Sequence, residues 1–312
     1  MPPAHPSADE LLSLLRGPGL LIDLGAVRVA EHADVPELAA QIGAVYRHFA
    51  PTAADAFADV RIHMRRRRRA WRPLHPQVRL WCDGEEPFEP FPASAALPML
   101  EWGANWLIGH RCNHLLLFHA GCLERDGLGL LLPATPGSGK STLTAALSHR
   151  GWRLLSDEFG ALDPEQRLLL PLLKPVALKN ESIAVIARHI PDALVGPHFP
   201  GTRKGTVAHV APQAAAVSRR HEPSRPAAVV LPQWLAGSET TLEPISPEDV
   251  FSALAFNAFN YQVLGETGFD AALALARQCP GWRLRYGDID DAIGRLDAWW
   301  RTTVAGRNAI AS

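Results

Sequence analysis

The run Ala-Thr-Pro-Gly-Ser-Gly-Lys-Ser-Thr at residues 134–142 constrains the fold of this chain more than any other stretch. It matches the phosphate-loop pattern except that Ala134 stands where the first glycine is usual. Such a loop needs a buried strand before it and a helix after it, because loop N–H groups and the helix N-terminus together hold phosphate oxygens. The apolar residues 128–133 predict that strand, and residues 141–149, which end before Gly151, predict that helix. The chain is therefore expected to be an α/β protein.

Each position of the loop has its own physical role. Gly137 and Gly139 permit the backbone conformations and the close approach that aim N–H groups at a β-phosphate. Lys140 is expected to reach the β- and γ-phosphates, and the Ser141 hydroxyl is expected to hold Mg²⁺. A small residue such as Ala134 fits the first position if its φ is negative. The predicted nucleotide-binding residues are Pro136, Gly137, Ser138, Gly139, Lys140, Ser141 and Thr142.

Two acidic residues follow the loop at the end of the next predicted strand, residues 152–156. A right-handed crossover is expected to return this strand parallel to the strand of the loop and beside it, so that Asp157 and Glu158 emerge near the phosphates. One acid could then hold Mg²⁺ while the other accepts a proton from an incoming hydroxyl. Ser156 follows Lys140 by only 16 residues, which favours a compact kinase-like core. The plain alternative is a solvated strand end.

The pattern along the chain predicts two parts: a smaller N-terminal α/β domain at residues 1–110 and a P-loop kinase domain at residues 111–312. The first part contains a predicted helix at 35–49 and predicted strands at 59–65 and 78–82. The second contains a predicted hairpin of strands 115–124 and 128–133, joined by an Asp-Gly turn, and later helices at 248–260, 268–278 and 288–300.

Composition narrows the classes of partner. A net charge of −1 gives the chain no overall attraction for nucleic acid or anionic membrane. The four cysteines have no CxxC spacing, the first residues do not resemble a signal peptide, and no apolar run is long enough to cross a bilayer, so a cytoplasmic protein with reduced thiols is expected. The arginine run from Arg65 to Arg69, with Arg72 nearby, is interpreted as a strand edge or hairpin tip, since no aromatic stacking pattern accompanies it.

The core segments resemble the HPr serine kinases, whose fold is shared with phosphoenolpyruvate carboxykinases. The resemblance rests on Phe-His-Ala-Gly at 118–121, the hairpin, the phosphate loop, Arg150-Gly151 and residues 154–158. Over nearly its full length the chain is similar to an HPr-kinase-related group often encoded beside exosortase-associated genes. The segments that carry this similarity are Glu-Trp-Gly-Ala-Asn-Trp at 101–106, Leu-Lys-Asn-Glu-Ser-Ile at 178–183, residues 202–209 and Asn-Ala-Phe-Asn-Tyr at 257–261.

The resemblance implies particular roles for three residues. Asp157 would act as the general base, and Glu158 would bind Mg²⁺ in place of the aspartate that the family has there. His119 would lie near the phosphates and influence the acidic pair. The family also implies a homo-oligomer. The one Gly-Arg-Asn in the chain, at residues 306–308, is not taken as the motif through which HPr kinases handle their protein substrate, so HPr itself is not implied as a substrate.

Further basic residues are weaker candidates. Residues 202–209 are predicted to form a loop that closes over the phosphates, in which Arg203 and Lys204 would neutralise transition-state charge. An exposed basic turn is the alternative. Lys179 lies in an apolar, strand-like context, which indicates either a phosphate or acidic ligand or a structural ion pair.

Together these features predict an ATP-dependent, Mg²⁺-assisted kinase that transfers the γ-phosphate to a hydroxyl of a peptide, protein or small molecule, with Asp157 as the base. The alternative is a nucleotide-binding regulatory ATPase or assembly factor without a dedicated acceptor. A reversible enzyme that also removes phosphate is a third hypothesis, which the sequence does not separate from the first.

Overall fold

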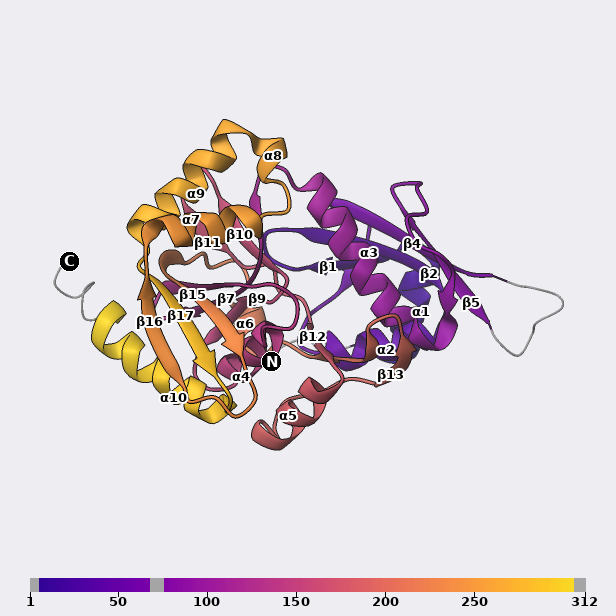
Figure 1. Cartoon of the computed structure of the whole chain (residues 1–312). Coiled ribbons are helices and arrows are strands. Elements are labelled where there is room, and N and C mark those ends of the chain that lie inside the picture. Colours follow the sequence, from indigo (N-terminus) through magenta and orange to yellow (C-terminus); the bar gives the residue numbers. More distant parts are fainter. Residues whose placement is uncertain (1–5, 68–75, 306–312) are drawn as a thin grey trace.

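The computed structural model describes residues 6–67 and 76–305, which form a mixed α/β structure with three sheets (Figure 1). The first strands are β1 (Leu20–Asp23), β2 (Arg28–Asp34), β3 (Thr52–Ala53), β4 (Val60–Arg67), β5 (Gln77–Cys82) and β6 (Phe91–Pro92). The others are β7 (Leu116–Arg125), β8 (Leu128–Pro133), β9 (Arg153–Ser156), β10 (Phe159–Asp163), β11 (Leu168–Leu170), β12 (Val176–Lys179), β13 (Phe199–Thr202), β14 (Gly205–Val210), β15 (Arg225–Trp234), β16 (Thr241–Ile245) and β17 (Gly281–Tyr286).

The helices complete the α/β class that the sequence predicts. The α-helices are α1 (Ala8–Arg16), α2 (Pro36–Val45), α3 (Ala96–Arg111), α4 (Lys140–Ser148), α5 (Glu181–His189), α6 (Ala214–Ser218), α7 (Pro247–Phe256), α8 (Tyr261–Leu264), α9 (Glu266–Gln278) and α10 (Ile289–Trp299). A short 3₁₀ helix, η1 (Ala93–Ala95), precedes α3, and a π-helical segment, η2 (Trp300–Ala305), follows α10.

The first sheet has the order β3-β1-β2-β4-β5-β6 and takes all its strands from the N-terminal part of the chain. The predicted helix at 35–49 is α2, and the predicted strands at 59–65 and 78–82 are β4 and β5. Of the two interpretations of the arginine run, the strand edge is wrong for Arg65, because β4 pairs with β2 on one side and with β5 on the other. The hairpin tip fits better, since the antiparallel pair of β4 and β5 ends at Arg67 and Gln77. Arg68, Arg69 and Arg72 lie outside the described residues.

The second sheet carries the phosphate loop and has the order β11-β10-β7-β8-β15-β17-β16. The hairpin of β7 and β8 is confirmed, and its turn has positive φ at Asp126 (55°) and Gly127 (77°), the conformation that an Asp-Gly turn favours. The predicted position of β9 beside the strand of the loop is wrong. One edge of β8 is paired with β7 and the other with β15, so β9 pairs with β7 instead.

The strands β9 and β10 lie end to end along the same edge of β7. The antiparallel register with β7 is the same at the Ser156–Cys122 pair and at the Phe159–His119 pair. Asp157 and Glu158 are therefore a short break in what is otherwise one continuous strand. The Ser156 hydroxyl spans this break by accepting a hydrogen bond from the Phe159 N–H (3.1 Å). Two acidic residues therefore lie outside the regular strand pairing, at the edge of β7 between its contacts with β9 and β10.

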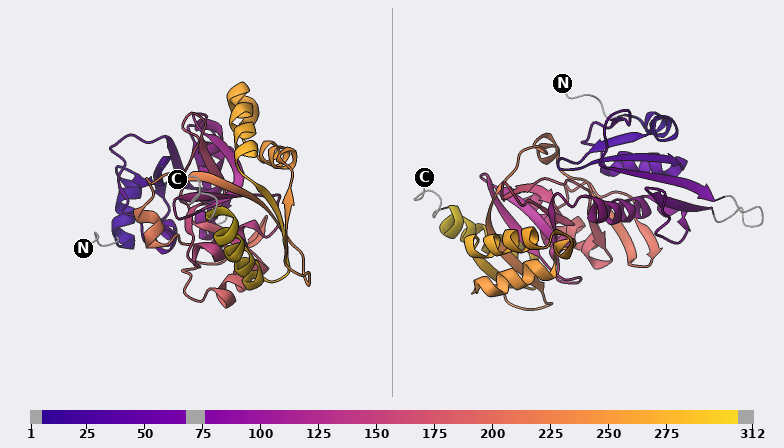
Figure 2. Two further views of the ribbon diagram at one scale, coloured as in Figure 1. Left: turned by 90° about the vertical axis from the view of Figure 1, so that its left-hand side faces the viewer. Right: turned by 90° about the horizontal axis from the view of Figure 1, so that it is seen from above.

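Helices cover both faces of the second sheet. One buried cluster joins α7 and α9 to the face that includes Leu131 and Val229. The opposite face, with Leu130 and Val230, packs in the main core with α4 and α10. Figure 2 shows α7 and α9 side by side, as their packing requires. The predicted helix at 248–260 is too long, since α7 ends at Phe256.

The third sheet, β12-β14-β13, is small and antiparallel. The prediction of a loop at residues 202–209 is wrong, because β13 and β14 form a hairpin there and only Arg203 and Lys204 lie at its tip. The main buried cluster runs from α1 through the first sheet and α3 to Trp300. Because this core is continuous, the division into domains at residues 110 and 111 stays a prediction. No helix in the described parts of the chain is long and apolar enough to span a bilayer.

Candidate active site

The phosphate loop has the backbone that its sequence requires. Gly137 and Gly139 have φ values of 90° and 83°, whereas Ala134 is not among the residues with positive φ, as its side chain demands. Two hydrogen bonds from other strands hold the loop: the backbone N–H of Trp234 donates to the Ser138 carbonyl (2.9 Å), and the Tyr286 hydroxyl donates to the Gly139 carbonyl (3.1 Å). A Cβ at Gly139 would lie 2.3 Å from the Tyr286 oxygen, so only glycine fits there.

Lys140 begins α4, and its side chain is buried. Its Nζ lies 3.2 Å from Asp157 Oδ1 and also donates to the backbone carbonyl of Asp157. Both side chains are buried, with 6% and 5% of their surface exposed. The loop lysine and the first acid of the predicted pair therefore form one buried ion pair, which joins the helix after the loop to the break between β9 and β10.

Glu158 points to the other predicted site residue, His119, whose Nε2 lies 3.8 Å from Glu158 Oε1. Burial, followed by repulsion from Lys140, lowers the pKa of His119, so the ring is neutral near neutral pH. Burial by itself would raise the pKa of Glu158, but Lys140 and His119, together with more distant lysines, lower it below its usual value. Glu158 is thus an ionised carboxylate beside a neutral imidazole.

The segment after α7 holds His119 in place. Where β8 leaves the sheet at Pro133, residues 257–260 continue along that side of β7, and the His119 N–H donates to the Asn257 carbonyl (2.6 Å). The buried Asn260 accepts from the Leu117 N–H (3.1 Å) and donates to the Leu115 carbonyl (2.8 Å). That residues 257–260 pair with β7 could not be predicted from the sequence, in which these residues continue the apolar pattern of a helix.

Gly121, two residues after His119, allows α4 to pack against β7. A Cβ on Gly121 would lie 2.2 Å from Thr144 Oγ1, a buried hydroxyl without a hydrogen-bond partner among the described residues. We expect Gly121→Ala to lower the free energy of unfolding by about 1–3 kcal/mol through overpacking. Urea denaturation should show this loss, and Thr144→Ala in the same chain should restore much of it, because the clashing oxygen is then absent.

The matched control for this prediction is Gly109→Ala in α3. A Cβ at Gly109 meets no atom within 4 Å, so this change should leave stability unchanged or raise it by roughly 0.5–1 kcal/mol. Equal losses for Gly109→Ala and Gly121→Ala would contradict the packing account.

A cavity of about 1050 Å³ joins these groups. It is lined by the whole predicted nucleotide-binding segment from Pro136 to Thr142 and by His119, Asp157 and Glu158. The chain contains four lysines, Lys140, Lys174, Lys179 and Lys204, and all four line this cavity, whereas its 27 arginines are spread over the molecule. Lys174 was not singled out in the sequence, because nothing in its local pattern distinguishes it. The cavity therefore collects every primary ammonium group of the described side chains.

The hairpin tip brings only one of its two predicted cations to the site. Lys204 lines the cavity, and its Nζ lies 5.1 Å from the centre of the Trp102 ring, a cation–π contact. Arg203 is exposed at the same tip but does not line the cavity. The structure thus separates Arg203 from the other predicted site residues.

The inner wall of the cavity contains a buried polar cluster between α3 and the N-terminal sheet. Lys174 Nζ lies 3.0 Å from Glu101 Oε2, and Glu101 accepts a hydrogen bond from the Tyr46 hydroxyl (2.7 Å). Glu31, buried nearby, has one carboxylate oxygen without a partner among the described residues. Burial, followed by repulsion from Glu101, raises the pKa of Glu31 to about 8.

Stability should therefore depend on pH through Glu31. A carboxyl whose pKa is raised in the folded state stabilises the protein below its unfolded pKa, and this contribution is lost as pH rises toward 8. We expect urea denaturation to show stability falling between pH 5 and pH 8, with a contribution from Glu31 on the order of 3 kcal/mol. Glu31→Gln should remove most of this slope, and the exposed Glu89→Gln should not. An unchanged slope in Glu31→Gln would contradict the assignment.

The donors present suit Mg²⁺ bound together with a nucleotide. Among the described residues, no three His, Cys, Asp or Glu side chains are grouped to hold a metal ion by themselves. Ser141, Asp157 and Glu158 nevertheless line one cavity beside the phosphate loop. Mg²⁺ is commonly held by one or two carboxylates and substrate phosphates, and P-loop proteins add a loop hydroxyl, so this set of oxygens fits that ion.

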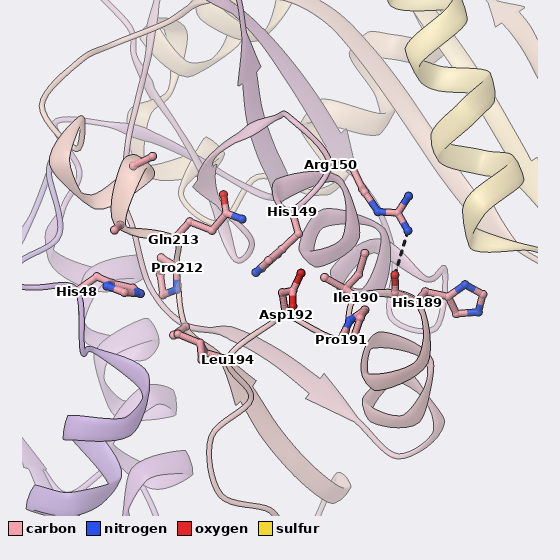
Figure 3. Close-up of a pocket in the computed structure, with 13 residues that line it drawn as sticks. His48, His149, Arg150, His189, Ile190, Pro191, Asp192, Leu194, Pro212 and Gln213 are labelled. Atoms are coloured by element: carbon pink, nitrogen blue, oxygen red, sulfur yellow. Dashed lines mark hydrogen bonds between the residues drawn. The ribbon is translucent and has the colours of Figure 1, made fainter.

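A second cavity, of about 580 Å³, lies at the other end of α4 (Figure 3). His149 and Arg150 line it together with His189 and Asp192. Arg150 already donates to the His189 carbonyl (3.0 Å) and pairs with Asp290 (3.2 Å). None of the predicted site residues lines this cavity.

No protein-family model and no curated protein matches the chain. The resemblance to HPr serine kinases therefore stays a prediction.

Proposed function

We propose that the chain is an ATP-dependent phosphotransferase with a P-loop kinase core of the HPr kinase and phosphoenolpyruvate carboxykinase type. The observation that carries this proposal is the buried contact of Lys140 with Asp157 (3.2 Å) within the cavity that the whole phosphate loop lines. A phosphate-binding lysine and a potential base meet at one point, where a γ-phosphate and an acceptor hydroxyl would also have to meet.

Lys140 is the cation that neutralises Asp157 in this structure. When phosphate oxygens replace the carboxylate as the partner of Lys140, Asp157 is released to accept a proton. The acceptor oxygen then forms a bond to the γ-phosphorus, the bond from that phosphorus to the bridging β–γ oxygen breaks, and the electron pair leaves with ADP. The acceptor proton passes to Asp157.

The remaining groups support this chemistry. Bound Mg²⁺, held by Ser141 and Glu158, would supply positive charge to the phosphate oxygens. Because the pKa of His119 is lowered, the ring adds no competing positive charge at neutral pH, and Lys140, which lowers the pKa of Glu158, keeps that carboxylate ionised for the metal. The hydrogen bonds from the Tyr286 hydroxyl and the Trp234 backbone N–H would hold the loop in place when phosphate binds.

Incubation of the purified chain with [γ-³²P]ATP, Mg²⁺ and a small-molecule extract of its host tests the proposal. We expect a labelled product other than inorganic phosphate, formed by the native chain and not by Asp157→Asn. Release of inorganic phosphate alone, at equal rates in the two proteins, would instead support the regulatory ATPase.

A further inference from the structure

Two of the four cavity lysines form no ion pair in the described part of the chain. Lys140 pairs with Asp157, and Lys174 pairs with Glu101. Neither Lys179 nor Lys204 has a carboxylate within ion-pair distance among the described residues. Both lysines are exposed where they line the cavity, so water solvates them, but they repel each other and would bind an anion placed between them favourably.

The fold keeps these two lysines close together. Asn180, the residue after Lys179, exchanges backbone and side-chain hydrogen bonds with Thr206: its N–H donates to the Thr206 carbonyl (2.9 Å), and its Oδ1 accepts from the Thr206 N–H (3.0 Å). These bonds tie the end of β12 to the hairpin tip that carries Lys204. Partial burial, followed by repulsion from Lys204, lowers the pKa of Lys179, as expected for two neighbouring cations.

The wall beside the two lysines is built for a polar ligand. His209 is 1% exposed and lines the cavity, yet both of its ring nitrogens lack a hydrogen-bond partner among the described residues. Burial lowers its pKa to about 4, so the ring is neutral and can donate one hydrogen bond and accept another. Asn105 and Trp102 line the same wall from α3, and Asn105 Oδ1 accepts a hydrogen bond from Lys174. The two buried ring nitrogens of His209 are costly to leave open unless a ligand or water satisfies them.

The size of the cavity limits the ligand. A volume of about 1050 Å³ lies at the upper end of the range for small-molecule sites, which leaves room for a compact second ligand beside a nucleotide. Glu101, Lys174 and His209, which line this inner wall, are each at least nine-tenths buried, so a ligand that contacts this wall has to enter the cavity as a compact group.

From these observations we infer that the phosphate acceptor is a small hydroxyl compound bearing a carboxylate or phosphate group, which Lys179 and Lys204 bind. His209 and Asn105 hydrogen-bond the body of the acceptor, and Asp157 faces its hydroxyl. This inference rests on the proposed phosphotransferase function and names the class of its second substrate. Phosphoryl transfer to this hydroxyl gives a phosphate ester and ADP, with the acceptor proton on Asp157.

Inorganic phosphate serves as the probe, because it carries the anionic group without the rest of the acceptor. The full chain is first saturated with Mg²⁺ and the non-transferable analogue AMPPNP, so that the phosphate loop is filled. Phosphate is then titrated, with heat and Trp fluorescence as readouts. We expect phosphate to bind the loaded protein without displacing AMPPNP, and the fluorescence change to vanish in Trp102→Phe, since Lys204 lies over that ring.

Variants of the two lysines separate the acceptor subsite from the nucleotide site. Lys179→Met and Lys204→Met should each weaken phosphate binding by about tenfold or more, the usual effect of losing one charge-assisted contact, and leave AMPPNP affinity unchanged. Arg277→Met, which removes an exposed cation from α9, is the matched control and should change neither. Asn180→Ala should weaken phosphate binding by a smaller factor than either lysine variant, because it removes the hydrogen bond between the end of β12 and the hairpin tip but removes no charge.

Three results would overturn the inference: no phosphate binding to the loaded protein, displacement of AMPPNP by phosphate, or loss of AMPPNP affinity in the lysine variants. The last result would place Lys179 and Lys204 on the nucleotide. Failure of the proposed function would look different. Label from [γ-³²P]ATP would then appear only as inorganic phosphate, at equal rates in the native chain and in Asp157→Asn, while phosphate would still bind the AMPPNP-loaded chain in a manner that depends on Lys179 and Lys204.

Discussion

Lys140→Met is expected to abolish productive ATP binding. The lysine is the only charged side chain of the phosphate loop, and a charge-assisted contact to phosphate contributes about 1.5–3 kcal/mol, or roughly a 10–150-fold change in affinity. Transfer should fall further, by about a thousandfold or more, because the charge that develops on the phosphoryl group loses its nearest fixed cation. Isothermal titration with Mg²⁺–ATP and a labelled transfer assay measure the two effects separately.

The buried partner of Lys140 requires a stability control. Removing one member of a buried ion pair leaves an uncompensated charge and can cost about 3–5 kcal/mol. The double variant Lys140→Met/Asp157→Asn has no such charge. Its free energy of unfolding should therefore be closer to that of the native chain than the value for Lys140→Met is, yet it should bind ATP no more tightly than Lys140→Met. Recovery of ATP affinity in the double variant would mean that lost stability, and not a lost phosphate contact, explains the single variant.

Asp157→Asn is expected to separate transfer from binding. A positioned base typically contributes about 10²–10⁴-fold to a rate, so kcat for phosphoryl transfer should fall by that factor. The affinity for Mg²⁺–ATP should stay within about threefold, because an amide keeps the size of the side chain and a base acts mainly in the transition state. Steady-state kinetics measures kcat, and titration calorimetry measures the affinity for Mg²⁺–ATP.

The exposed acid Glu165, changed to Gln, is the control for Asp157→Asn, since it removes the same charge from a nearby turn. A joint loss of transfer and of ATP affinity in Asp157→Asn would reject the role of general base. It would instead assign Asp157 to metal binding or to holding the loop.

The local parts of the site could be predicted from sequence because each depends on neighbours in the chain. The phosphate loop needs its glycines at fixed positions, and the hairpin before it needs Asp126 and Gly127 at positive φ. The apolar runs of β7 and β8 give the strands that position the loop. These patterns are short and carry their own physical reason.

The parts that could not be predicted depend on pairings between distant segments. The sequence shows that Asp157 ends a strand, but not that β7 and β15 already occupy both edges of β8 and force β9 onto β7. Likewise, residues 257–260 continue an apolar pattern, yet they leave the helix because the end of β7 offers unpaired backbone groups. The convergence of Lys174, Lys179 and Lys204 on one cavity is a property of the tertiary structure alone.

A crystal structure of the full chain with Mg²⁺ and AMPPNP tests the central claim most directly, through the distances from Lys140 Nζ to Asp157 and to the nucleotide. We expect Lys140 to leave Asp157 Oδ1, now 3.2 Å away, and to contact the β- and γ-phosphates, with the Asp157 carboxylate free and facing the γ-phosphorus. A nucleotide bound elsewhere, or a Lys140–Asp157 pair that stays intact beside a bound nucleotide, would contradict the proposed phosphotransfer site.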